Sequence, residues 1–250
     1  MSVLGVIPAR LGSTRLPQKP LQLLGGVPLV VRVAERVRAV GGVDELVIAT
    51  DAAAIARVVE QAGFRAVLTS SAHQTGTERV AEVAARDEFT GFDRILNVQA
   101  DEPFLPAEAL TGALARLASG DDVGTAAAPL DPADADDPAR VKVVIDLTGR
   151  ALYFSRARIP FQHGPEMPSA GLYWQHLGVY AYTRGALARW VTWPRALLEA
   201  AERLEQLRAL AHGLQIGVTR LPDAALPGID TPDDLRRAEA HLLSTHGVPA

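Results

Sequence analysis

Short apolar runs alternate with longer amphipathic stretches along the first hundred residues. Leucine, valine, isoleucine and alanine recur at three- and four-residue spacing over 29–37 and 55–62, which is typical of helices with one buried face. Asp51 stands where it is expected to cap the second helix. Largely hydrophobic runs, typical of parallel strands buried on both faces, lie at 3–7, 46–49, 66–68 and 95–98. This order predicts an α/β fold with a mostly parallel sheet, right-handed crossovers and helices on both faces.

The pattern changes after residue 121. A strand at 123–128 is followed by two apolar runs that flank the turn 147–150, which predicts an antiparallel hairpin. The segment 162–175 is rich in Gly, Pro and Ser, and we expect it to close over a substrate. We therefore predict a single domain over 1–250, with an inserted lobe at about 121–182 that forms a lid and dimer contacts.

The last third of the chain returns to alternating strands and helices. Residues 176–182 and 215–219 read as strands, and apolar residues at helical spacing predict one helix over 198–211. On that helix Glu205 lies at the edge of the apolar stripe and Gln206 lies nearly opposite it. Both positions are typical of solvated side chains.

A polar loop follows the first predicted strand. It places Gly, Ser and Thr at 12–14 between three cations, Arg10, Arg15 and Lys19. In an open α/β sheet, ligands bind beyond the carboxyl ends of the strands, where this loop begins. Arginine and lysine side chains with backbone amides suit the several negative charges of a nucleoside triphosphate. A solvated surface loop is the alternative on charge spacing alone.

Two common phosphate-binding motifs are absent from this loop. A P-loop requires Gly-Lys-Ser/Thr at the start of a helix, whereas Lys19 lies between Gln18 and Pro20. A Gly-x-Gly-x-x-Gly dinucleotide fingerprint is also missing. The loop is therefore expected to be a different kind of nucleotide site.

Two carboxylates are candidates for a metal site. Asp101 follows the fourth strand, where a hard cation such as Mg²⁺ is held by one or two carboxylates together with substrate phosphates. The alternative is that Asp101 only caps the next helix. Thr231 is a natural N-cap with Asp234 three residues on, which leaves Asp230 free for other chemistry.

Residues 75–78, Thr-Gly-Thr-Glu, fit a capping box in which Thr75 caps a helix and Glu78 reaches back. Capping explains most of this segment, but it does not require the neighbouring Arg79. A nucleotide contact is the functional interpretation of Arg79, and a structural role is the alternative.

Composition narrows the choice of partners. The chain has 250 residues and no cysteine, so disulfides, thiolate metal sites and cysteine nucleophiles are excluded. The formal net charge of −4 argues against a general nucleic-acid or membrane-surface binder. No basic segment precedes an apolar core at the start, and no apolar run approaches the length of a membrane span. We expect a cytoplasmic protein.

Seven motifs in order resemble those of the 3-deoxy-manno-octulosonate cytidylyltransferase (CMP-Kdo synthetase) family. They are spread along nearly the whole chain and lie at 7–21, 73–79, 97–103, 152–156, 176–180, 204–208 and 228–232. The resemblance implies a Rossmann-like nucleotidyltransferase fold with a smaller antiparallel excursion, and a homodimer. One position departs from the pattern: Ala100 stands where the family often has Gly, and a positive φ there would strain Ala.

The resemblance also implies roles for individual residues. Catalysis is assigned to Arg15, Lys19, Asp101 and Asp230, with Mg²⁺ shared by the two aspartates. Contacts to the nucleotide are assigned to Pro8, Ala9, Arg10, Ser13, Arg15, Lys19, Arg79 and Gln99. Contacts to the sugar acid are assigned to Arg156, His176, Tyr180, Glu205 and Gln206.

The implied reaction is transfer of CMP from CTP to 3-deoxy-D-manno-octulosonate, which releases pyrophosphate and activates the sugar for lipopolysaccharide synthesis. Two alternatives stay open. One is a cytidylyltransferase for another acidic sugar, and the other is a nucleotide-binding module without catalysis. Composition and spacing alone predict only a nucleotide-binding α/β enzyme.

Overall fold

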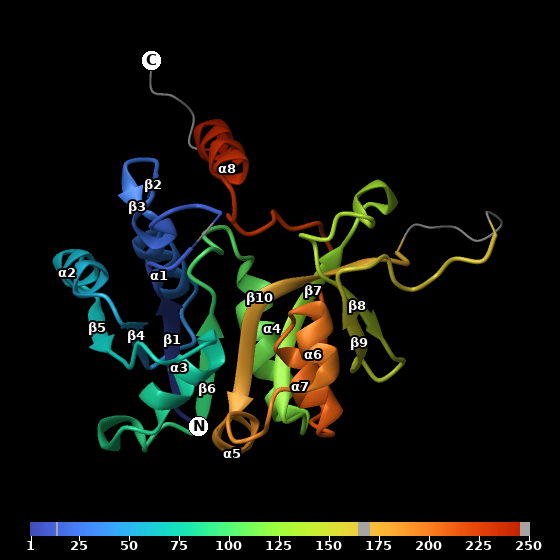
Figure 1. Ribbon diagram of the computed structural model, residues 1–250, viewed down its shortest axis with the longest axis horizontal. Helices are drawn as coiled ribbons and strands as arrows, with labels where there is room; N and C mark the ends of the chain where they lie inside the picture. Colours follow the sequence, from blue (N-terminus) through green and yellow to red (C-terminus); the bar gives the residue numbers. More distant parts are fainter. Residues whose placement is uncertain (14, 165–170, 246–250) are drawn as a thin grey trace. The chain divides into compact units, whose positions relative to one another are not determined.

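The computed structural model describes residues 1–13, 15–164 and 171–245, which form two compact units (Figure 1). The first unit contains residues 2–91, 97–104 and the described part of 226–250, and the second contains Met1, 92–96 and 105–225. Strand β6 (Arg94–Val98) contributes residues to both. The predicted lobe at 121–182 lies within the second unit, and part of its closing loop, 165–170, lies outside the described residues. Its roles as lid and dimer surface stay predictions.

The first unit has the predicted parallel order. Its strands β1 (Val3–Ala9), β4 (Glu45–Thr50) and β5 (Arg65–Leu68) pair in parallel, with β4 in the middle. Helices α1 (Leu29–Val40), α2 (Ala53–Gln61) and α3 (Gly76–Ala84) pack against these strands. Every residue of β1 is buried, as its continuous apolar sequence predicts. Between β1 and α1 lies a small hairpin of β2 (Leu23–Leu24) and β3 (Val27–Pro28).

The two predicted helix caps in this unit have different outcomes. The Thr75 side chain accepts a hydrogen bond from the Glu78 amide at 3.2 Å, which confirms the cap of α3. The prediction for Asp51 is wrong, because the N-cap of α2 is Ala52 and no side chain caps it. The Asp51 carboxylate instead binds the buried guanidinium of Arg79 at 2.9 Å. An ion pair with a buried cation is stronger than a cap on a solvated helix end.

The second unit holds the antiparallel part of the fold. Strand β7 (Val123–Pro129) pairs antiparallel with β10 (Trp174–Thr183) and parallel with β11 (Ile216–Arg220). The predicted hairpin is confirmed as β8 (Lys142–Ile145) and β9 (Ala151–Ser155), and β8 also pairs with β10. Helix α4 (Ala107–Ala118) packs on β7, β10 and β11, and α5 (Arg184–Trp190) packs on β10. The whole is an α/β fold with a mixed sheet.

The single helix predicted over 198–211 is wrong. The structure has two short helices, α6 (Leu197–Glu202) and α7 (Gln206–Ala211), and Arg203 between them adopts a left-handed conformation with φ of 54°. Glu199 and Arg208 form a buried bidentate ion pair, with distances of 2.6 and 2.8 Å. Nine residues of continuous helix would separate them by about 13.5 Å. The chain therefore breaks so that the pair can form.

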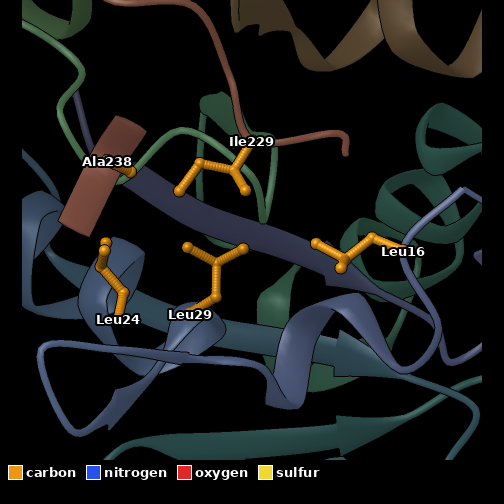
Figure 2. Packing of buried hydrophobic residues seen from close by; sticks show 5 residues of the cluster. All are labelled: Leu16, Leu24, Leu29, Ile229 and Ala238. Atoms are coloured by element: carbon orange, nitrogen blue, oxygen red, sulfur yellow. The ribbon is translucent and has the colours of Figure 1, made fainter. Parts of the chain in front are cut away.

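A small apolar cluster in the first unit fixes three segments that are far apart in sequence. Figure 2 shows the buried side chains of Leu16, Leu24, Leu29, Ile229 and Ala238 pointing toward one another. Ala238 belongs to α8 (Pro232–Thr245), and Phe104, Leu235 and Leu242 pack around the cluster. Leu16 follows Arg15 and Ile229 precedes Asp230, so this packing holds two predicted site residues in place.

We predict that Ile229→Ala lowers the free energy of unfolding by about 2–4 kcal/mol, because it leaves a cavity in this cluster. Ile229 is 1% exposed, whereas Leu243 on α8 is 62% exposed, so Leu243→Ala is the matched control and should change stability by less than about 0.5 kcal/mol. Urea unfolding of the two variants measures the difference. Equal effects would mean that the cluster does not hold the segment.

Candidate active site

Four charged side chains meet in the first unit. The Lys19 ammonium lies 2.6 Å from Asp101 Oδ2 and 2.8 Å from Asp230 Oδ1, and Arg15 Nη2 lies 2.8 Å from Asp230 Oδ2. Arg15 and Lys19 come from the loop after β1, Asp101 follows β6, and Asp230 precedes α8. The prediction that these distant residues gather at one place is confirmed. The two carboxylates share one ammonium.

Backbone contacts place each of these side chains. Residues 19–21 form a single 3₁₀ turn that starts after Gln18, whose φ of 51° directs the chain into it. The Ile229 amide donates to the Asp101 carbonyl at 2.9 Å, which joins the two acidic segments directly. Asp234 accepts from the amides of Asp230 and Thr231 at 3.1 and 2.9 Å, and Thr231 caps the Asp234 amide at 3.2 Å, as predicted. Capping therefore uses Thr231 and Asp234, and leaves the Asp230 carboxylate to the cluster.

Electrostatics keep Lys19 charged. Burial alone lowers the pKa of the Lys19 ammonium, but the charges and hydrogen bonds of Asp101 and Asp230 outweigh it, so the pKa is raised above its ordinary value. A protonated Lys19 keeps the two neighbouring carboxylates from repelling each other. The cluster is an ion-binding arrangement in which a cation already bridges two acidic groups.

The other residues predicted to contact the nucleotide surround the end of β1. Pro8 and Ala9 are the last, buried residues of that strand. A methyl group added at Gly76 would lie 3.3 Å from Pro8 Cγ and 3.5 Å from Gln99 Nε2, so these three residues adjoin. Arg10 is exposed, and Ser13 accepts from the Leu16 amide at 3.3 Å. Their contacts to a nucleotide stay predictions.

Arg79 has a structural environment. Its side chain is 2% exposed, and it donates to Asp51, to Thr69 and, at 3.4 Å, to the Ser70 carbonyl. These bonds tie α3 to the segments that follow β4 and β5. A contact between Arg79 and the nucleotide stays a prediction, and the structural alternative already accounts for three of its bonds.

Glu82 is a positioning residue that sequence reasoning missed. Its carboxylate accepts from the Ser70 amide at 2.8 Å, lies 2.6 Å from His73 Nε2 and binds Arg86 at 3.0 Å. Burial opposes its charge, but these hydrogen bonds lower the pKa of Glu82 to about 2. The carboxylate thereby anchors the segment 70–73 to α3. A glutamate within a helix carries no sequence signal for such a role.

Ala100 is not strained. Among the described residues, the non-glycine positions with positive φ are Gln18 and Arg203, so Ala100 needs no glycine-like conformation. The departure from the family pattern at this position therefore leaves the backbone beside Asp101 unaffected.

Two of the residues predicted to contact the sugar lie side by side on β10 in the second unit. The rings of His176 and Tyr180 are 5.1 Å apart, and Phe154 packs edge-on against His176 at 5.2 Å. The Thr125 hydroxyl donates to the Val179 carbonyl at 2.6 Å, so it must accept from His176 Nε2 at 3.0 Å. His176 therefore carries its proton on Nε2, and its Nδ1 is an acceptor suited to a hydroxyl.

Tyr180 is buried, and Glu205 and Gln206 near α7 are more buried than solvated side chains would be. Burial raises the pKa of Tyr180 well above its ordinary value, and the neighbouring charge of Glu205 adds to the effect, so Tyr180 stays a neutral phenol. Glu205 is the N-cap residue of α7 and is partly buried. Gln206 is 5% exposed, so the alternative that it is a solvated side chain is wrong, and its contact to the sugar acid stays a prediction. The break before α7 turns it inward.

Arg156 follows β9 and is held by hydrogen bonds to carbonyl oxygens. Its Nε donates to the Glu202 carbonyl and its Nη1 to the Pro138 carbonyl, each at 2.9 Å. The side chain is partly buried, and the residues around it differ from those around His176. Its contact to the sugar acid stays a prediction.

Two features are absent from the described part of the chain. No helix there is both long and apolar enough to span a membrane. No three or more His, Cys, Asp and Glu side chains gather there to hold a metal ion by themselves. A metal at Asp101 and Asp230 would need further ligands, such as substrate phosphates.

The chain is a nucleotidyltransferase, as its fold and its relatives show. The chain belongs to the cytidylyltransferase family, whose model matches residues 4–216. It is 54% identical to the 3-deoxy-manno-octulosonate cytidylyltransferase of Gemmatimonas aurantiaca, over 99% of this chain and 97% of that protein. It is 47% identical to the protein of the same name from Methylococcus capsulatus, over 95% of each.

Solved structures agree with this assignment. CMP:2-keto-3-deoxy-manno-octonic acid synthetase complexed with CTP has a TM-score of 0.89 and 36% identity, and the match covers 98% of this chain and all of that one. A putative glucose-1-phosphate thymidylyltransferase from Bacillus anthracis is similar in fold, with a TM-score of 0.67, 16% identity and coverage of 96% of this chain and 95% of that one.

The protonation state of His176 predicts how the stability of the protein depends on pH. Burial lowers the pKa of His176 to about 3, against about 6.5 when unfolded. Between these values the unfolded chain binds more protons, so the contribution of His176 to stability is full above pH 6.5 and is lost as the pH falls toward 3. Urea unfolding from pH 4 to 8 should show wild type losing more stability than His176→Asn on acidification. A constant difference between the two proteins would contradict this state of the ring.

Proposed function

We propose that this chain transfers CMP from CTP to 3-deoxy-D-manno-octulosonate, releasing pyrophosphate. The anomeric C2 hydroxyl oxygen attacks the α-phosphorus, the bond to the β-phosphate oxygen breaks, and the hydroxyl proton leaves to water. The observation that carries the proposal is the Lys19 ammonium held between Asp101 and Asp230 beside Arg15. It combines cations for a triphosphate with carboxylates for a metal. The names of the relatives support the base and the sugar.

Arg15 and Lys19 would bind the triphosphate and stabilise the charge that develops on pyrophosphate as it leaves. Such catalysis rests on position and on electrostatics that are already organised before the reaction. In the free protein carboxylates hold the two cations at the site, and an arriving triphosphate would compete with these carboxylates for them. Pro8, Ala9 and Gln99 would contact the rest of the nucleotide.

The two carboxylates fit Mg²⁺. They converge on one cationic group, which is the arrangement that a two-carboxylate magnesium site requires, and substrate phosphates would complete the ligands. When bound, Mg²⁺ would neutralise phosphate charge and lower the pKa of the attacking hydroxyl. Asp101 and Asp230 would hold it, and no protein base is then needed.

We also propose a cytoplasmic homodimer that supplies activated sugar for lipopolysaccharide synthesis. The similarity to the family supports this assembly and this role, and the absence of cysteine is consistent with a reducing compartment. Light scattering during gel filtration, and fractionation of cells, measure the two properties.

Pyrophosphate release with CTP, Mg²⁺ and a panel of sugar acids tests the reaction. We predict turnover with 3-deoxy-D-manno-octulosonate, and a fall in kcat of at least about 100-fold for Asp101→Asn and for Asp230→Asn. Asp233→Asn is the matched control, because Asp233 is an exposed acid in the first turn of α8 that pairs with Arg236. Preference for another sugar acid would correct the substrate. Near-full turnover in Asp101→Asn would remove the metal assignment.

A second prediction concerns Lys19. Because its ammonium neutralises both carboxylates, a divalent ion that arrives without nucleotide must displace it. Lys19→Met should therefore bind Mn²⁺ without CTP about tenfold more tightly than wild type, and should bind CTP more weakly. Mn²⁺ titration followed by electron paramagnetic resonance measures the first effect. Equal Mn²⁺ affinity in the two proteins would show that Lys19 does not occupy the metal position.

A further inference from the structure

A buried lysine in the second unit has no part in the proposed chemistry. Lys142 on β8 is 0% exposed, and its ammonium donates to two backbone carbonyls, that of Asp137 at 2.9 Å and that of Arg156 at 2.6 Å. An apolar side chain of similar size would avoid the cost of burying a charge. Desolvation of the ammonium by burial lowers the pKa of Lys142, although the charges of Asp137 and Asp136 oppose this effect. A lysine in this place is thus costly and needs a reason.

The two carbonyls show what Lys142 holds. One belongs to Arg156, so the ammonium fixes the backbone of that residue directly. The other belongs to the segment 137–138, whose Pro138 carbonyl accepts from Arg156 Nη1 at 2.9 Å. Lys142 therefore fixes both the residue and one of the groups that orient its guanidinium.

Glu202, at the end of α6, holds Arg156 from the other side. Its carboxylate accepts from the Arg156 amide at 2.9 Å and from the Ser155 hydroxyl at 2.5 Å, and its carbonyl accepts from Arg156 Nε at 2.9 Å. The amide, the carbonyl and two nitrogens of the guanidinium of Arg156 are thus all bonded. Such a residue is fixed before any ligand arrives.

The guanidinium of Arg156 is bonded by neutral groups. Its Nε donates to the Glu202 carbonyl and its Nη1 to the Pro138 carbonyl, while the Glu202 carboxylate bonds the Arg156 amide and the Ser155 hydroxyl. The charges of Asp136 and Asp137 act on Lys142, and Arg156 is partly exposed. A fixed, partly exposed guanidinium whose hydrogen bonds go to neutral oxygens suits a carboxylate ligand.

We propose that Lys142 and Glu202 are positioning residues that hold Arg156 ready for the carboxylate of the sugar acid. The inference rests on the proposed function, because it takes the sugar acid as the ligand of Arg156. It adds two residues that act through Arg156 and do not themselves contact the substrate.

The test combines enzyme variants with a change in the substrate. In Lys142→Met, the KM for the sugar acid should rise about 10- to 100-fold, with less change in kcat and none in the KM for CTP. Replacing the substrate carboxylate by its amide should cost wild type a similar factor and cost Lys142→Met much less, since the variant no longer presents Arg156 correctly. A purely structural role would leave the cost of the amide unchanged.

Arg150→Met is the matched control. Arg150 lies at the other end of the same hairpin and pairs with Asp121 at 2.7 Å, so its loss also removes a cation from this sheet. It should lower stability without changing the KM for the sugar acid. Glu202→Ala, at a partly buried position, should reproduce the effect of Lys142→Met and decides the question if that variant does not fold.

The outcomes distinguish failure of the positioning roles from failure of the proposed function. The positioning roles alone would be overturned if wild type turns over and Lys142→Met and Glu202→Ala match Arg150→Met. The match would have to hold both for the KM of the sugar acid and for the loss of activity with the amide. No pyrophosphate release by wild type with any sugar acid would overturn the proposed function itself.

Discussion

One lysine shared by two aspartates is the interaction on which the first unit depends. Three segments meet at this ammonium, although Asp101 lies 82 residues and Asp230 lies 211 residues from Lys19 in the sequence, and each is also held by neutral contacts close to its charged side chain. Leu16 and Ile229 pack in one apolar cluster, and the amide of Ile229 bonds the Asp101 carbonyl at 2.9 Å. Apolar packing therefore helps to hold the carboxylates of Asp101 and Asp230 close together, and the Lys19 ammonium offsets the repulsion between them. A site built in this way is charged, compact and ready for a second cation.

The cationic side chains of the candidate sites have different partners in the two units. In the first unit, Arg15 and Lys19 bond carboxylates, so an arriving triphosphate must compete with Asp101 and Asp230 for them. In the second unit, Arg156 bonds carbonyl oxygens, which are neutral and leave its charge available. The first arrangement suits a ligand that brings its own metal ion, because the displaced carboxylates gain a cation in exchange. The second suits a ligand with a single carboxylate.

Local patterns predicted much of this fold. Continuous apolar runs marked the strands, which are buried on both faces, and helical spacing marked α1 and α2, which are buried on one face. The capping box marked the start of α3. Two local facts marked Asp101 and Asp230 as candidates, since Asp101 follows a strand and Thr231 with Asp234 accounts for the cap of α8. That the two share one site was implied by the resemblance to a family. The resemblance to a family supplied the base, the sugar and the sugar contacts, which no spacing could provide.

The errors share a physical cause, which is ion pairing between residues distant from each other. Glu199 and Arg208 break a helix that apolar spacing alone makes continuous, and the break turns Gln206 inward. Arg79 takes Asp51 away from a helix cap. Lys142 lies within an apolar strand sequence, where nothing in its neighbours reveals that its ammonium reaches Arg156. Each of these partners is chosen by the folded arrangement.

The most direct test of the shared-ammonium account is a crystal structure of the protein with CTP and Mg²⁺. The account predicts that Lys19 leaves both carboxylates to contact phosphate oxygens, and that Mg²⁺ lies on Asp101 and Asp230. A structure in which Lys19 still bridges the two aspartates, while the triphosphate and its metal bind elsewhere, would contradict it.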